Sequence, residues 1–166
     1  MFDVSRKELK YIVSPHEISG LKRRLSPLMR SDPHNGGQGE GYRVRSLYFD
    51  TPFDTDYEEK ISGCQERRKI RLRIYDPSDQ TVKLELKEKN GTAQRKRSIL
   101  LDREEAACMI RGEYGFLREH EEELALPLYL LMTQKCYRPK CVVEYARYAY
   151  CLEHNEPRVP FDTGLL

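Results

Sequence analysis

The chain lacks tryptophan, has no hydrophobic run long enough to span a bilayer, and carries almost no net charge. Its 29 basic and 27 acidic side chains leave a formal charge of +2 over 166 residues. This balance argues against binding to nucleic acid by charge alone, and no RNP-type aromatic motif is present. We therefore expect neither a nucleic-acid partner nor a membrane span. Any cationic site must come from where the charges are placed.

Cofactor motifs and targeting segments are also missing. No cysteine lies in a C-x-x-C pair, so the spacing predicts no zinc site. No signal-peptide segment follows Met1, and no G-x-x-x-x-G-K-[ST] phosphate loop is present. We expect reduced thiols, a cytoplasmic protein and one domain over residues 1–166. The five cysteines are Cys64, Cys108, Cys136, Cys141 and Cys151.

The most informative stretch is residues 65–76, Q-E-R-R-K-I-R-L-R-I-Y-D, in which charged and apolar residues alternate. Successive side chains of a strand point to opposite faces, so this alternation predicts a strand. Three cations follow one another on one face with no acid between them, which is unusual for a solvated strand. One face carries Lys69, Arg71, Arg73 and Tyr75, and the other carries Ile70, Leu72 and Ile74.

The next two segments add further cations. Residues 81–89, T-V-K-L-E-L-K-E-K, place Lys83, Glu85, Lys87 and Lys89 on one face of a second strand. Asn90-Gly91 predicts a hairpin, which leads into the basic segment 94–101. Neighbouring strands with basic faces predict a surface that holds an anion with several negative charges. A solvated face of a basic sheet is the alternative interpretation.

Strands and helices are also predicted in the rest of the chain. Ser14-Pro15-His16-Glu17 has the pattern of a capping box and starts a helix. Residues 31–41 are rich in glycine and predict a loop, and residues 126–133 form a short apolar segment. The further strands are expected over residues 5–13, 42–50, 139–152 and 157–162, and helices over residues 15–29, part of 51–63, 102–111 and 114–124.

A sheet whose basic faces met would have a charged interior. Burying so many charges is costly unless they are paired or bind something. A chain of phosphates with a divalent cation is the natural occupant, because arginine suits bidentate phosphate contacts. Carboxylate oxygens suit Mg²⁺ or Mn²⁺, which makes Glu8, Glu85 and Glu144 the candidate metal ligands.

Eight short motifs, in order along nearly the whole chain, resemble one family. They are R-K-E-L-K-Y at 6–11, S-L-Y-F-D-T at 46–51, Y-E-E-K-I-S-G at 57–63, R-x-K-I-R-L-R-I-Y at 67–75, K-L-E-L-K at 83–87, K-R-S at 96–98, Y-A-R-x-A-Y at 145–150 and R-V-P-F-D at 158–162. The chain resembles the VTC domain, the polyphosphate-polymerase domain of the vacuolar transporter chaperone complex, and above all its soluble bacterial relatives. That family is part of the CYTH-like triphosphate tunnel metalloenzymes.

The resemblance implies an α+β fold in which an antiparallel β tunnel with flanking helices binds triphosphate. It implies transfer of the γ-phosphate of ATP to a polyphosphate chain, with Mn²⁺ or Mg²⁺ bridging phosphate oxygens. By this analogy the phosphate-binding residues are Lys10, Lys60, Lys69, Arg71, Arg73, Lys87, Lys96, Arg147 and Arg158. The expected catalytic residues among them are Lys10, Arg71, Arg73, Lys87 and Arg147.

The end of the chain departs from the family pattern. Family members continue past the R-V-x-F-D segment into further strands and a helix, and one of those strands carries a metal-binding glutamate. We therefore expect a tunnel that lacks its C-terminal part, with an open sheet edge that favours a homodimer. Three functions stay open: a polyphosphate polymerase, a hydrolase of tripolyphosphate or nucleoside triphosphate, and a non-catalytic module that binds polyphosphate or inositol phosphate.

Overall fold

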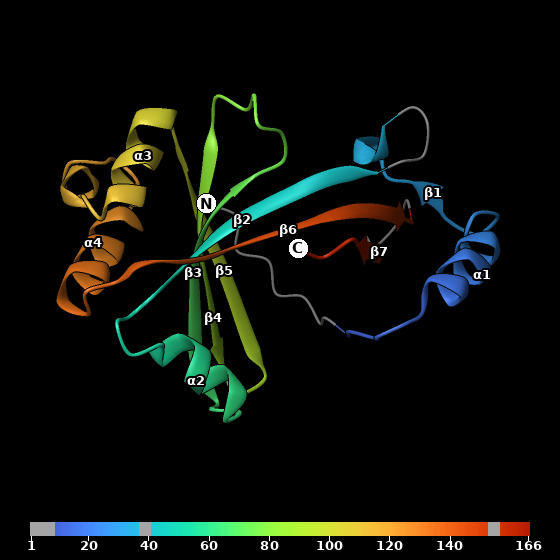
Figure 1. Cartoon of the computed structure of the whole chain (residues 1–166), viewed down its shortest axis with the longest axis horizontal. Helices are drawn as coiled ribbons and strands as arrows, with labels where there is room; N and C mark the ends of the chain where they lie inside the picture. Colours follow the sequence, from blue (N-terminus) through green and yellow to red (C-terminus); the bar gives the residue numbers. More distant parts are fainter. Residues whose placement is uncertain (1–8, 37–40, 153–156) are drawn as a thin grey trace. The chain divides into compact units, whose positions relative to one another are not determined.

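The computed structural model describes residues 9–36, 41–152 and 157–166. These residues form two compact units, which are described separately (Figure 1). Unit 1 comprises residues 45–143, and unit 2 comprises residues 9–44 together with residues 144–166. Strands β2 (Tyr42–Asp50) and β6 (Arg138–Cys151) run through both units.

Unit 1 is built on an antiparallel sheet with the strand order β2-β3-β4-β5. Its remaining strands are β3 (Glu66–Ile74), β4 (Val82–Asn90) and β5 (Ala93–Leu101). The two-residue turn Gly91-Thr92 joins β4 to β5, and Gly91 adopts a φ of +57°, which favours glycine. The expected central strands and their hairpin are therefore confirmed.

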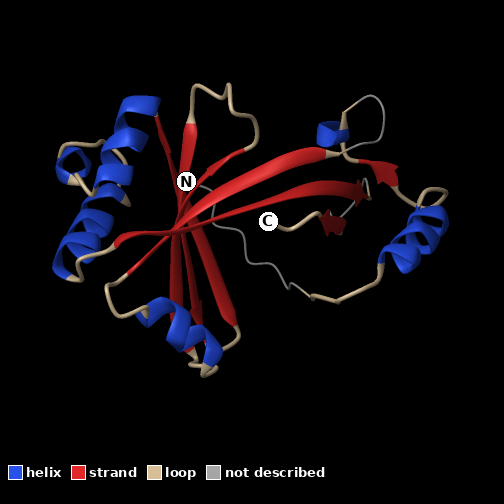
Figure 2. Ribbon diagram, in the orientation of Figure 1, coloured by secondary structure: helices blue, strands red, loops and turns tan. Residues whose placement is uncertain are grey.

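Helices cover the apolar face of this sheet. The helices α3 (Arg103–Arg111) and α4 (Ala125–Gln134), with the 3₁₀ helix η2 (Gly115–Arg118) between them in sequence, lie beside one another on this side (Figure 2). The core that they form with the strands includes Ile70, Leu72, Leu84, Ile99, Met109, Leu117, Leu128 and Met132, all buried. The alternation of β3 and β4 thus divides the sheet into an apolar, helix-covered face and a charged face, as predicted.

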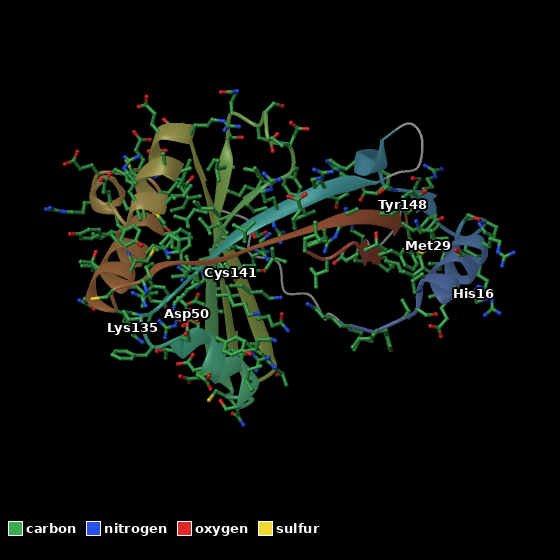
Figure 3. The ribbon with its side chains drawn as sticks, viewed as in Figure 1. His16, Met29, Asp50, Lys135, Cys141 and Tyr148 are labelled. Atoms are coloured by element: carbon green, nitrogen blue, oxygen red, sulfur yellow. The ribbon has the colours of Figure 1, made fainter. Side chains whose placement is uncertain are left out.

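Helix α2 (Thr55–Ile61) follows β2 and depends on one carboxylate. The Asp50 side chain accepts hydrogen bonds from the backbone N–H groups of Thr51 (2.7 Å), Asp56 (2.9 Å) and Tyr57 (3.0 Å). These groups have no partner within the helix, so a carboxylate at the helix start satisfies them and suits the helix dipole. Figure 3 shows Asp50 beside α2.

Unit 2 contains α1 (Pro15–Leu25), β1 (Arg30–Ser31), η1 (Pro33–Asn35) and β7 (Arg158–Thr163). Both β1 and β7 pair with β6 in antiparallel fashion. The buried side chain of Asn35 donates to the Ala149 carbonyl (2.6 Å) and accepts from the Ala149 N–H (2.9 Å), which ties η1 to β6. The capping box of Ser14 and Glu17 is confirmed at the start of α1.

Several predicted elements need correction. The first helix ends at Leu25 rather than Met29, because Pro27 has no N–H to continue the helical hydrogen bonds. The helix expected over residues 114–124 is wrong: only η2 forms there, and α4 instead takes up the apolar segment that was expected after it. Residues 9–13 lie outside any strand, and the rest of that predicted strand, residues 5–8, lies outside the described residues. None of the helices in the described part of the chain is long and apolar enough to cross a bilayer.

Candidate anion-binding site

The charged face of the unit 1 sheet gathers its cations in three neighbouring rows. In the strand register Tyr48, Arg71, Glu85 and Ser98 form one row, Ser46, Arg73, Lys83 and Leu100 a second, and Lys69, Lys87 and Lys96 a third. Side chains in one row lie next to one another on the same face of the sheet. We call Lys69, Arg71, Arg73, Lys83, Glu85, Lys87 and Lys96 the cationic face.

Glu85 is the single carboxylate of the cationic face, and its side chain is only 2% exposed. Its Oε2 accepts from Arg71 Nε at 2.6 Å and lies 3.7 Å from Arg73 Nη1. Its Oε1 lies 2.5 Å from Lys96 Nζ. Burial by itself would raise the pKa of Glu85, but the three cations outweigh burial and lower the pKa to about 2. Glu85 is therefore ionised throughout the neutral and mildly acidic range.

Two polar side chains of β2 position the arginines. Arg71 Nη1 donates to Tyr48 Oη (2.9 Å), and Arg73 Nε donates to Ser46 Oγ (3.2 Å). Burial would lower the pKa of Arg71, but Glu85 and Tyr48 raise it above its usual value. Both guanidinium groups are thus largely buried and restrained before any ligand binds. Sequence reasoning missed Tyr48 and Ser46 as site residues, because the two faces of residues 42–50 are mixed in sequence and only the register with β3 places these side chains on the charged face.

Three lysines add further positive charge to the cationic face. Lys69, Lys87 and Lys96 lie directly opposite one another in adjacent strands. Like charges directly opposite one another are unfavourable in a sheet, and Glu85 offsets this for Lys96. Lys83 Nζ lies 5.2 Å from the centre of the Tyr75 ring, within range of a cation–π contact. The lysines thus extend the positive charge of the face beyond the two arginines.

Two predicted phosphate ligands lie in unit 2, and both are held by acids. Arg147 forms two hydrogen bonds with Asp162, from Nε to Oδ1 (2.7 Å) and from Nη2 to Oδ2 (2.8 Å). Arg158 Nη2 lies 2.7 Å from Asp32 Oδ2 and donates to Tyr42 Oη. Burial would raise the pKa of Asp32, but hydrogen bonds from His34 and Cys151 and the charge of Arg158 lower it. These arginines therefore stabilise unit 2 in the structure as it stands.

The remaining predicted residues are spread over the chain. Lys10 lies in the exposed segment before α1, and Lys60 is exposed in the last turn of α2. Glu144 belongs to unit 2, where its Oε1 lies 3.3 Å from Arg43 Nε. Glu8, a candidate metal ligand, lies outside the described residues.

The described acids do not fit a pre-formed metal site. A divalent cation needs several oxygen ligands, and Glu85 is surrounded by guanidinium and ammonium groups that would repel it. Within the ranges that the structure describes, no cluster of three or more histidine, cysteine, aspartate or glutamate side chains is placed to hold a metal ion.

Comparison with solved structures identifies the fold. A candidate adenylate cyclase from Bacillus halodurans has a TM-score of 0.61 at 14% identity, covering 98% of this chain and 73% of its own. A candidate adenylyl cyclase from Hippeastrum, described as having a dominant triphosphatase activity, has a TM-score of 0.55 at 14% identity, covering 92% of this chain and 71% of its own. These likenesses confirm the predicted α+β fold of the triphosphate-tunnel type.

Sequence comparison settles the family. None of the curated proteins matches the chain by sequence. The VTC domain family matches residues 5–166, which is almost the whole chain. The protein therefore belongs to the VTC domain family, as its scattered motifs indicated.

Proposed function

We propose that the cationic face binds the phosphates of a triphosphate or polyphosphate, and that the protein transfers the γ-phosphate of ATP to a polyphosphate chain. The observation that carries the binding proposal is the pair Arg71 and Arg73. Both are largely buried, and both are restrained by β2 and by Glu85. Each belongs to one of the rows of the cationic face. Membership of the VTC domain family supports the choice of phosphate as ligand.

In this proposal the protein acts by positioning and by neutralising charge. Arg71 and Arg73 present planar guanidinium groups that suit two oxygens of one phosphate, whereas the lysines act as point charges along the chain. Phosphoryl transfer has a transition state with charge spread over the phosphate oxygens, so restrained cations lower its free energy. Lys87, Lys96 and Lys69 are proposed to align the rest of the phosphate chain on the same face.

Mn²⁺ or Mg²⁺ is proposed as a cofactor that enters together with the phosphates. Magnesium is commonly held by one or two carboxylates and by substrate phosphate oxygens rather than by a protein cage. This agrees with the lack of a pre-formed metal cluster among residues 9–36, 41–152 and 157–166.

A hydrolase is the second candidate function. The observation that favours it is the triphosphatase activity described for the Hippeastrum protein, which has a similar fold. The same cations would serve a reaction in which water takes the phosphate. A phosphate-binding module without turnover would also use them.

Binding is tested first with tripolyphosphate, measured by calorimetry on the wild type and on Arg71→Ala and Arg73→Ala. Hydrogen bonds to charged groups contribute about 1.5–3 kcal/mol, so we expect affinity to fall about tenfold to a hundredfold in each variant. Arg95→Ala is the matched control, because Arg95 lies on β5 but on the opposite face, in register with Glu88. Equal affinity in the wild type and in both variants would refute the site.

Turnover is tested with ATP labelled at the γ-phosphate, in Mn²⁺ and in Mg²⁺. Label in long polyphosphate supports the polymerase, and label in free phosphate supports the hydrolase. Tight tripolyphosphate binding with no turnover in either metal would favour the binding module. The homodimer through an open sheet edge, the cytoplasmic location and the absence of a nucleic-acid partner stay predictions.

A further inference from the structure

Glu85 is a carboxylate in the centre of the cationic face, and its contacts are those of a bound anion. Its two oxygens lie 2.6 Å from Arg71 Nε and 2.5 Å from Lys96 Nζ. A phosphate oxygen would seek the same donors at the same distances. Glu85 is also 2% exposed, so its charge is not screened by solvent as a surface carboxylate would be.

Arg71 and Lys96 differ in how easily each can break its contact with Glu85. The Arg71 side chain is 18% exposed and is also held by Tyr48, whereas the Lys96 side chain is 49% exposed. Lysine carries its charge on a flexible stem, and β5 is an end strand of the unit 1 sheet. Lys96 is therefore the cation that can turn from Glu85 to an arriving ligand while Arg71 and Arg73 stay in place.

We infer that Glu85 is a built-in counter-anion that keeps the cationic face folded without ligand and competes with phosphate for Lys96. The inference rests on the proposed function, since it assigns a role to Glu85 within the same site. It replaces the expectation that Glu85 is a metal ligand. Glu85 thus acts as a positioning residue for Arg71 and Arg73.

Two opposite effects of Glu85→Gln follow, and a purely structural ion pair would give only the first. Without anions the melting temperature falls, because Arg71 and Arg73 lose their buried partner. Affinity for tripolyphosphate rises by about tenfold or more, because a negative charge next to the ligand has been removed. The dependence of binding on salt concentration should steepen as well.

The experiment is a melting-temperature scan and a calorimetric titration with tripolyphosphate, without metal, on the wild type and Glu85→Gln. Glu88→Gln is the matched control: it lies on the same strand but on the opposite face, paired with Arg97 at 2.9 Å. The control should leave affinity unchanged. If Glu85→Gln is unfolded in buffer, the inference requires that tripolyphosphate restores the fold, and failure to restore it overturns the inference.

The outcomes separate the inference from the proposed function. A wild type that binds tripolyphosphate, with a Glu85→Gln variant that binds it equally or more weakly, overturns the inference alone. A wild type and a Glu85→Gln variant that both fail to bind overturn both. A melting-temperature increase with Mn²⁺ alone that Glu85→Gln abolishes would show a metal ligand instead, and would also overturn the inference.

Discussion

The phenol of Tyr137 donates a hydrogen bond to Asp56 Oδ1 at 2.8 Å, between two residues that are 81 positions apart and both buried. Burial raises the pKa of Asp56 to about 6, because the Tyr137 hydrogen bond and the charge of Arg68 do not offset burial and the nearby acids Asp50 and Glu59. The pKa is thus higher in the folded state than in the unfolded chain, where it lies near 3.8.

Asp56→Asn is expected to change how stability depends on pH. A raised pKa stabilises the fold while the carboxyl is protonated, so this contribution is present below about pH 4 and is lost as pH rises through about 6. Asparagine keeps the acceptor for Tyr137 and cannot ionise. As pH rises from 4.5 to 7.5, the wild type should therefore lose stability that Asp56→Asn keeps. The unfolding free energy of the variant should rise relative to that of the wild type by about 1 kcal/mol over this range, after allowance for solvent screening.

Urea denaturation at several pH values measures this difference. Tyr137→Phe, which removes the donor but leaves the carboxyl, is expected to lower stability at every pH. A constant difference between Asp56→Asn and wild type from pH 4.5 to 7.5 would show that Asp56 does not titrate in this range.

Leu72→Ala and Leu100→Ala should differ sharply in stability. Leu72 is buried in the unit 1 core, whereas Leu100 is 60% exposed on the charged side of the same sheet. Truncating a buried leucine costs about 2–5 kcal/mol, and an exposed one costs within about 0.5 kcal/mol. Urea denaturation measures both. A larger loss for Leu100→Ala would mean that the two faces are assigned the wrong way round, and equal losses would contradict the difference in burial.

Asp162→Asn should loosen the end of unit 2. The two hydrogen bonds between Asp162 and Arg147 join residues that are directly opposite in β7 and β6. We expect faster amide hydrogen exchange in β7, measured by mass spectrometry, while β3 and β4 exchange as before. Glu113→Gln, which removes an exposed ion pair with Arg111, is the control. Unchanged exchange in β7 would show that β7 is held by its backbone alone.

Asp102→Ala and Ser14→Ala remove the same motif from two helices. Each residue forms a capping box, with Glu105 at α3 and with Glu17 at α1. Losing a cap costs about 0.5–2 kcal/mol. Because α3 contributes Ala106 and Met109 to the core, loss of its cap in Asp102→Ala should lower the free energy of global unfolding in urea.

Helix α1 buries no side chain, so Ser14→Ala should instead increase amide exchange within α1 alone. A global loss in Ser14→Ala would contradict this.

Local patterns predicted most of unit 1. The alternation in β3 and β4 determined which residues join the apolar core, because alternate side chains of a strand lie on the same face. It did not predict that Arg73 and Glu85, on the charged face, are buried as well. The capping box of Ser14 and Glu17 located the start of α1. The run of glutamates at residues 119–123 was interpreted as a helix, but no apolar stripe in that run can pack against a core, and helices gain most of their stability from packing.

Pairing between distant residues could not be predicted in the same way. Alternation shows that Glu85 shares a face with Arg71, but not that Lys96 completes its contacts. The pair of Asp32 and Arg158 and the pair of Asp56 and Tyr137 join segments far apart in the chain. Such contacts depend on strand register and on turn geometry, and neither can be predicted directly from a single sequence.

The charged rows of β3, β4 and β5 also restrict how the hairpin can form. If β4 slipped by one residue at the Gly91-Thr92 turn, Lys83, Glu85 and Lys87 would move into the apolar core and Leu84 and Leu86 would move out. Burying those charges carries a free-energy penalty, which makes misaligned hairpins unstable. The site residues therefore also favour the native strand register during folding. Neutralising several of them would remove more than a ligand site: it would also permit alternative alignments that the natural sequence rejects.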